Sequence, residues 1–193
     1  MNEFISHKKR LRKILAHQRD LIKKKSSIEF NEDVFNKLKN YIDFNEIKDV
    51  ASFVSIRSEI STDHLNKKIL ELKKTLSFPV VKKNIDELVF KRSNLENNFK
   101  IGKFNIPEPR SDSQEIIPQL FFVPCLGFDL NGFRLGYGGG FYDKTFTNLK
   151  NLNFKFYTVG FAFDDQKQFK IPTENFDYKL DFVLTEKQLY KFL

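Results

Sequence analysis

Apolar residues recur every three to four positions over residues 6–25, which is the period of an amphipathic α-helix. The apolar members of this stripe are Leu11, Ile14, Leu15, Leu21 and Ile22. Lysines and arginines surround them, so the pattern predicts a long helix with one buried face. Comparable patterns predict helices over residues 31–40, 63–75 and 141–150, and a last short helix that starts at Thr185.

Short apolar runs predict buried strands at residues 50–54, 88–90, 120–123, 154–163 and 182–184. Residues 78–81 form another such run, but Pro79 argues against a central hydrogen-bonded position. Residues 91–119 are polar and rich in proline, and we expect them to form connections carrying short strands. The alternation of helices and strands predicts one domain spanning residues 1–193. We expect it to be a three-layer α/β/α fold, Rossmann-like, with a mostly parallel central sheet.

Net charge and cysteine content restrict the possible functions only weakly. The 193 residues carry 33 Lys and Arg against 25 Asp and Glu, a formal net charge of +8. That excess fits either nucleic-acid binding or a lysine-rich surface around a site for a small anion. Cys125 is the only cysteine, which excludes an intramolecular disulfide and fits a reducing compartment. Without an apolar signal core or a bilayer-length apolar run, we expect a cytoplasmic monomer with no membrane or nucleic-acid partner.

The most informative segment carries four glycines within five positions, Gly136, Gly138, Gly139 and Gly140. Such a loop can adopt positive φ angles and point backbone N–H groups at an anion, and the predicted helix after it presents its positive end there. Asp143 suits magnesium, and Arg134 suits phosphate. The segment matches neither a Walker A motif nor a dinucleotide-binding fingerprint. A tight turn between a strand and a helix would account for the glycines equally well.

As a whole string, Val123 to Lys144 (VPCLGFDLNGFRLGYGGGFYDK) is more specific than its glycines. It resembles the signature of the 5-formyltetrahydrofolate cyclo-ligase family, with Phe141 and Lys144 as mild departures. Other segments that resemble this family, in its order, are residues 8–12 (KKRLR), 55–62 (SIRSEIST), 102–109, 160–166 (GFAFDDQ) and 177–186 (DYKLDFVLTE). In the segment 102–109, Asn105 stands where a glycine is commoner.

The resemblance implies an enzyme whose substrates are ATP and 5-formyltetrahydrofolate, with Mg²⁺ as cofactor. The implied reaction phosphorylates the formyl oxygen, lets N10 attack the activated carbon, and gives 5,10-methenyltetrahydrofolate, ADP and phosphate. Such an enzyme aligns its substrates and neutralises developing charge.

The resemblance also assigns residues by position. For ATP it implies Lys8, Lys9, Arg10, Leu11, Arg12, Arg134, Leu135, Gly136, Tyr137, Gly138, Gly139, Gly140, Phe141 and Tyr142. For the folate it implies Val54, Glu59, Tyr137, Gly138, Gly139, Gly140 and Phe141, with Glu59 meeting the pterin N–H groups. Asp143 and Asp177 would hold magnesium. The implied catalytic residues are Arg134, Tyr142 and Asp143.

Plainer explanations stand beside these roles. Lys8 and Arg12 fit the solvated face of a helix, and Glu59 fits an acid at a helix N-terminus. Asp177 fits a solvated loop, and Asp129 fits an acid that shapes the turn at Asn131-Gly132. A different enzyme on a similar sheet, such as a sugar-phosphate isomerase, would need neither ATP nor magnesium. A basic nucleic-acid-binding module would show steep salt dependence of binding.

Overall fold

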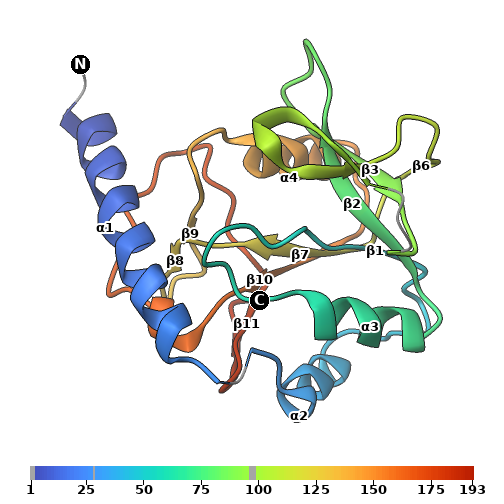
Figure 1. Cartoon of the computed structure of the whole chain (residues 1–193), viewed down its shortest axis with the longest axis horizontal. Helices are drawn as coiled ribbons and strands as arrows, with labels where there is room; N and C mark the ends of the chain where they lie inside the picture. Colours follow the sequence, from blue (N-terminus) through green and yellow to red (C-terminus); the bar gives the residue numbers. More distant parts are fainter. Residues whose placement is uncertain (1–2, 28, 96–98) are drawn as a thin grey trace.

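The computed structural model describes residues 3–27, 29–95 and 99–193 (Figure 1). Its helices are α1 (Glu3–Lys25), α2 (Glu32–Asn36), α3 (Asp63–Glu71) and α4 (Phe141–Asn151), with the short 3₁₀ helices η1 (Lys37–Asn40), η2 (Lys103–Asn105) and η3 (Asp164–Gln166). Its strands are β1 (Asp49–Ala51), β2 (Thr75–Val81), β3 (Leu88–Arg92), β4 (Phe99–Ile101), β5 (Pro107–Pro109), β6 (Glu115–Ile116), β7 (Leu120–Pro124), β8 (Gly127–Phe128), β9 (Arg134–Leu135), β10 (Tyr157–Phe161), β11 (Phe182–Leu184) and β12 (Leu189–Lys191).

Eight strands form one sheet in the order β12-β11-β10-β7-β1-β2-β3-β6. The strands from β11 to β2 run parallel, whereas β12, β3 and β6 pair antiparallel at the two edges. Figure 1 shows α2 and α3 below this sheet and α4 above it. The predicted three-layer α/β/α fold with a mostly parallel sheet is therefore confirmed.

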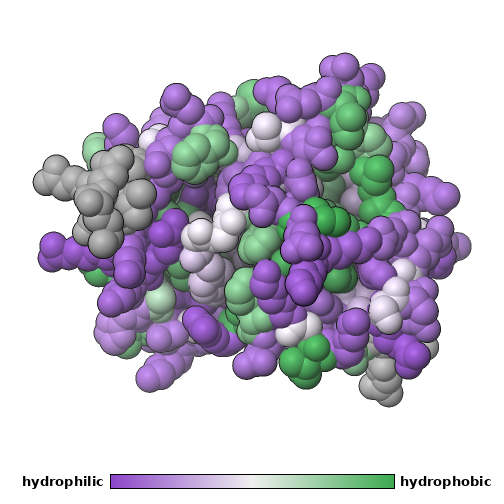
Figure 2. All heavy atoms as spheres, turned by 90° about the horizontal axis from the view of Figure 1, so that it is seen from above, coloured by the Kyte–Doolittle hydropathy of each residue, from purple (hydrophilic) through white to green (hydrophobic). Residues whose placement is uncertain are grey.

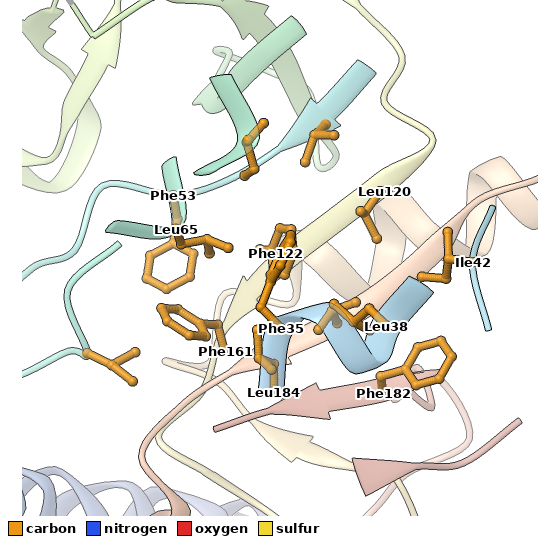
Figure 3. Close-up of a cluster of buried hydrophobic side chains, with 14 of the residues drawn as sticks. Phe35, Leu38, Ile42, Phe53, Leu65, Leu120, Phe122, Phe161, Phe182 and Leu184 are labelled. Carbon is orange, nitrogen blue, oxygen red and sulfur yellow. The ribbon is translucent and has the colours of Figure 1, made fainter. Parts of the chain in front are cut away.

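The strand β7 shows why the sequence folds in three layers. Leu120 and Phe122 belong to the core cluster between the sheet and the helices α2 and α3. Phe121 and Val123 belong to the cluster between the sheet and α4. All four side chains are fully buried, so a strand covered on both faces reads as an unbroken apolar run. On the lower face, Phe122 stacks on Phe35 of α2 with ring centroids 6.3 Å apart (Figure 3).

Of two predictions about local structure, the one for Pro79 holds at the residue itself, and the one for Thr185 was wrong. The strand β2 lies inside the sheet although it contains Pro79. It tolerates the proline because β1 pairs only with Thr75 to Ser77, so β2 at Pro79 is paired on one side alone, with Phe90 of β3. Thr185 starts no helix, because its side-chain oxygen accepts hydrogen bonds from the amides of Lys187 and Gln188. That turn leads directly into β12.

Other boundaries moved by a few residues. The helix α1 begins at Glu3, ahead of the predicted residue 6, and α3 ends at Glu71 instead of 75. The connection predicted over residues 91–119 carries the short strands β4, β5 and β6, as expected, and residues 96–98 within it lie outside the described residues.

The helix α1 does not cover the sheet. It lies along one side of the molecule beside the β8–β9 hairpin (Figure 1). Leu15 of α1 joins a small separate core with Leu126, Leu135 and Ile171, and Leu11 packs at its edge. This contact sets the helix next to the glycine-rich segment that follows β9.

The surface is mainly hydrophilic where it can be seen. Figure 2 shows hydrophilic side chains over most of the upper face, with hydrophobic ones in small groups between them. Among the described helices, none combines the length and the apolar character needed to span a membrane.

Candidate active site

One face of α1 carries a row of residues spaced by about one turn, Lys8, Arg12, Leu15 and Arg19. Lys8, Leu15 and Arg19 are almost fully buried, with 5%, 2% and 1% of their surface exposed. Lys8 is therefore not a solvated lysine. Lys9 and Arg10 lie outside this row and are exposed to solvent.

Arg12 lies directly against the glycine loop, residues 136–140. Its Nε donates a hydrogen bond of 2.9 Å to the carbonyl oxygen of Gly136. Gly138 has a φ of +102°, and a Cβ placed there would lie 3.0 Å from Cζ of Arg12. Glycine at this position is required both by the backbone conformation and by the close approach of the guanidinium.

Asp143 occupies the first turn of α4, immediately after the loop. Its Oδ1 lies 3.3 Å from Nη2 of Arg134 and accepts a 3.2 Å hydrogen bond from the amide of Tyr178. The guanidinium of Arg134 in turn stacks over the ring of Tyr142 at 5.6 Å. The structure thus brings together the three residues predicted to be catalytic.

Two polar atoms of this group stand out within the described part of the chain. Nε of Arg134 and the hydroxyl of Tyr142 are buried and have no hydrogen-bond partner among protein atoms. Burial raises the pKa of the Tyr142 hydroxyl well above its usual range. Buried polar groups are normally paired, so a polar ligand bound here would supply the partners that these two atoms lack among protein atoms.

Asp177 lies in the same region but is held by protein groups. Its Oδ2 accepts hydrogen bonds from Nζ of Lys8 at 2.5 Å and from the amide of Glu174 at 2.7 Å. Lys8 also pairs with the carboxylate of Glu174 at 3.0 Å. Because Tyr178 binds Asp143, the segment 174–178 joins the start of α1 to the start of α4.

Glu59 is buried and contacts Tyr137 of the loop. Its Oε1 accepts a 2.8 Å hydrogen bond from the hydroxyl of Tyr137, and its Oε2 accepts one of 2.9 Å from the amide of Ile56. Nη1 of Arg19 lies 3.5 Å from the same Oε1. Burial raises the pKa of Glu59, although the neighbouring Arg19 and the hydrogen bonds oppose that shift. Glu59 precedes α3 by four residues and therefore does not serve as a first-turn helix acid.

Arg19 is the site residue that sequence reasoning missed. The available signal was its position: it occupies the apolar stripe of α1, one turn beyond Leu15, where a charged side chain must be paired to be buried. Lys103 and Phe104 were missed as well. The ring of Phe104 lies 6.2 Å from that of Phe141, and Nζ of Lys103 lies over both rings.

Several residues singled out from the sequence contribute to packing or to the backbone conformation. Leu11 and Leu135 pack in the small core beside α1, and Val54 packs at the edge of the core under α2 and α3. Asn105 adopts a φ of +57°, which explains why a glycine suits its position.

Asp129 shapes the turn at Asn131-Gly132, as the sequence predicts. It is 1% exposed, and its Oδ1 accepts hydrogen bonds from the amides of Asn131 and Phe133. Its Oδ2 accepts another from the amide of Ile171. With both oxygens used inside the fold, this carboxylate stabilises the β8–β9 hairpin and the chain that packs against it.

Comparison with known proteins shows similarity over most of the chain. The sequence profile of the 5-formyltetrahydrofolate cyclo-ligase family matches residues 5–186. The 5-formyltetrahydrofolate cyclo-ligase of Haemophilus influenzae is 34% identical over 146 residues, 73% of this chain and 77% of that protein. The Escherichia coli enzyme of the same name is 31% identical over 147 residues, 74% of this chain and 80% of that protein.

Solved structures show the same fold. The structure of 5,10-methenyltetrahydrofolate synthetase from Aquifex aeolicus superimposes with a TM-score of 0.71 at 28% identity, covering 96% of this chain and 92% of that one. A Mycoplasma pneumoniae 5,10-methenyltetrahydrofolate synthetase gives a TM-score of 0.68 at 21% identity, covering 93% and 98%. The profile match over nearly the whole chain and the relatives above 30% identity lead to one conclusion: this chain belongs to the 5-formyltetrahydrofolate cyclo-ligase family.

Proposed function

We propose that this chain closes the ring of 5-formyltetrahydrofolate to give 5,10-methenyltetrahydrofolate, and that it drives the closure with ATP. The observation that carries the proposal is the convergence of three groups on the loop 136–140. Arg12 contacts the loop backbone, Asp143 and Arg134 lie at its end, and Glu59 binds the loop's tyrosine, Tyr137. The loop thus joins a cationic region to a buried carboxylate.

The cationic region suits the phosphates of ATP. The loop supplies backbone N–H groups, and the N-terminus of α4 adds its positive end to the same place. Arg12, held at the loop by Gly136, and Arg134 supply fixed positive charge beside them. Arginine matches phosphate oxygens with two parallel N–H donors, so both residues can hold a phosphate in a fixed orientation.

The residues present also fit magnesium. Among the described residues no cluster of three or more His, Cys, Asp or Glu side chains forms a closed metal site. Magnesium bound with ATP needs only one or two carboxylates, because phosphates and water fill its other positions. Asp143 and Asp177, joined by the segment 174–178, would hold it, and bound magnesium would neutralise phosphate charge. Asp177 has to share its carboxylate with Lys8 to take part.

The buried carboxylate suits the folate. An ionised Glu59 can accept two parallel hydrogen bonds from the N–H groups at a pterin edge. Phe141, directly after the loop, and Phe104, whose ring lies 6.2 Å from that of Phe141, offer apolar ring surface to a flat ligand. In this arrangement the loop contributes to both halves of the site, so the formyl group and the γ-phosphate can meet beside it.

The proposed reaction requires that the formyl oxygen of the folate be aligned with the γ-phosphorus of ATP. The formyl oxygen attacks the γ-phosphorus, ADP leaves, and the oxygen becomes part of a phosphate leaving group. N10 attacks the activated carbon and loses its proton, the ring closes, and inorganic phosphate departs with the former formyl oxygen. Arg134, which contacts Asp143 and Tyr142, would stabilise the charge that develops on the transferred phosphoryl group. No covalent intermediate on the protein is needed.

A direct assay tests the proposal. Purified protein is mixed with ATP, magnesium and 5-formyltetrahydrofolate, and the near-ultraviolet absorbance of the methenyl product is followed. We expect product only when all three are present, with one ADP released per product. A non-hydrolysable ATP analogue serves as the control and should give none. Product formed without ATP, or ATP hydrolysis without product, would contradict the proposal.

A further inference from the structure

Arg19 is a charged side chain in an unusual place. It is the largest of the fully buried side chains, with 1% of its surface exposed. It lies on α1 two turns beyond Arg12, the residue that contacts the loop backbone. Burying a charge is costly unless it is paired, so the partners of this guanidinium reveal what the residue does.

Some partners of the Arg19 guanidinium belong to the surrounding fold, and others belong to the predicted folate site. Nε donates to the hydroxyl of Ser58 at 3.3 Å, and Nη1 reaches the carbonyl oxygen of Cys125 at 3.5 Å. The other contacts are with two predicted folate residues. Nη2 donates a 2.7 Å hydrogen bond to the hydroxyl of Tyr137, and Nη1 pairs with Oε1 of Glu59.

The three side chains form one directed hydrogen-bond chain. Arg19 donates to the Tyr137 hydroxyl, which has a single hydrogen and donates it to Glu59. The guanidinium also lies over the Tyr137 ring at 5.6 Å. Tyr137 is 43% exposed, so its ring reaches the surface of the loop while its hydroxyl is held inside. The same helix therefore contacts the loop twice, through Arg12 at Gly136 and through Arg19 at Tyr137.

Arg19 is also the close positive charge at Glu59. The other titratable groups that face this carboxylate are Tyr137 of the loop, Cys125 after β7 and Tyr142 of α4. Burial raises the pKa of Cys125 and of Tyr137 to about 12, so both stay neutral at physiological pH. Asp20 is a further acid close to Arg19, and its carboxylate accepts a hydrogen bond from the hydroxyl of Ser58. Removing Arg19 would leave Glu59 buried with no close cation, a condition in which a carboxyl group takes up a proton.

We propose that Arg19 is a positioning residue for the folate half of the site, where it pairs with the carboxylate of Glu59 and holds Tyr137 in place on the glycine loop. The identity of the ligand rests on the proposed function. The effect on Glu59 and Tyr137 does not, because it is a property of the protein without ligand.

The first test compares Arg19→Met with Lys24→Met. Lys24 is an exposed residue of the same helix, so the control removes the same charge from the same element. We expect Arg19→Met to raise the KM for 5-formyltetrahydrofolate about ten-fold or more, the effect of losing about one strong polar contact. The KM for ATP should stay within about two-fold, since Arg12 still holds the loop backbone. Arg19→Lys should recover part of the folate affinity, and Lys24→Met should behave like the unmodified protein.

A double-mutant cycle asks whether Arg19 acts through Glu59. In a Glu59→Gln background the carboxylate is gone, so we expect Arg19→Met to have less than about half of its effect on the folate KM. An undiminished effect would overturn the proposal. So would equal losses of ATP and folate affinity accompanied by a lower melting temperature, because that result indicates a purely structural arginine.

A ligand-free measurement separates this proposal from the proposed function. Carboxyl carbons of glutamate are labelled with carbon-13, and Glu59 is assigned by comparison with Glu59→Gln and titrated by NMR. We expect Glu59 to take up its proton at a higher pH in Arg19→Met than in the unmodified protein or in Lys24→Met. An unchanged titration overturns the role of Arg19. If the unmodified protein does not convert the folate but the titration shifts, the proposed function fails and the role of Arg19 stands.

Discussion

Gly138→Ala tests the contact between α1 and the glycine loop. Gly138 has a φ of +102°, which side chains with a Cβ rarely adopt. The three atoms nearest to an added Cβ all belong to the guanidinium of Arg12, and the closest, Cζ, lies at 3.0 Å. The substitution therefore strains the backbone and also pushes Arg12 from its place at Gly136.

The two effects have separate magnitudes. Holding alanine at such a φ costs about 1–3 kcal/mol, which lowers the free energy of unfolding. Displacing Arg12 loses its hydrogen bond to the carbonyl of Gly136, and hydrogen bonds of charged groups contribute about 1.5–3 kcal/mol. If Arg12 holds ATP, its displacement weakens ATP binding by about ten- to a hundred-fold.

Gly140→Ala is the matched control. Gly140 also has a positive φ, +67°, but an added Cβ there would have no atom within 4 Å. It should therefore lose stability through the backbone alone and lose less ATP affinity than Gly138→Ala. ATP binding is measured by calorimetry and stability by denaturant unfolding. In an Arg12→Ala background, Gly138→Ala should cost little further ATP affinity. A full additional loss there, or equal losses in both glycine variants, would refute the steric argument.

Three further predictions concern the charged groups of the site. Lys8→Ala combined with Arg12→Ala should raise the KM for ATP more than that for the folate, and normal ATP binding by calorimetry would contradict this. Asp143→Asn should lower turnover sharply at limiting magnesium, because it removes charge stabilisation that could contribute several kcal/mol. Circular dichroism should show that the fold is intact, and unchanged turnover would refute the assignment. Glu59→Gln should weaken folate binding about ten-fold or more and spare ATP binding, since the amide turns a donor toward a donor at a cost of roughly 1–3 kcal/mol.

The raised pKa of Glu59 has a consequence for stability as well. Its pKa in the native state lies above its ordinary value of 4.5, so the native protein holds this proton more tightly than the unfolded chain does. Its contribution to stability is therefore fully present below pH 4.5 and is lost as the pH rises through the raised pKa. Denaturant unfolding over this pH range should show a steeper loss of stability with rising pH in the unmodified protein than in Glu59→Gln. Equal slopes would contradict the shift.

Much of the fold could be predicted because buried strands and buried helix faces appear as apolar patterns in the sequence. The strand β7 is covered on both faces, and it reads as an unbroken apolar run. Pro79 fits inside the strand order because a proline excludes a hydrogen bond on one side only, and the end of β1 at Ala51 frees that side. Thr185 misled because a hydroxyl that can start a helix can equally close a turn, and the partner strand decides between the two.

The candidate site was only partly visible in the sequence. The glycine loop and Asp143 are contiguous, so a motif reveals them. Glu59 and Tyr137 are 78 residues apart, Arg19 and Tyr137 are 118 apart, and no local pattern shows that these three residues meet. The pairing of Lys8 with Asp177, 169 residues apart, is of the same kind. It joins a predicted phosphate-binding lysine to a predicted magnesium ligand.

The path of the formyl oxygen tests the central claim most directly. 5-Formyltetrahydrofolate is labelled with oxygen-18 in its formyl group and converted with ATP and magnesium, and the inorganic phosphate is analysed by mass spectrometry. If ATP phosphorylates the formyl oxygen, each phosphate released carries one labelled oxygen from the folate. Labelled water together with unlabelled phosphate would mean that ATP hydrolysis and ring closure are chemically separate, and would contradict the account.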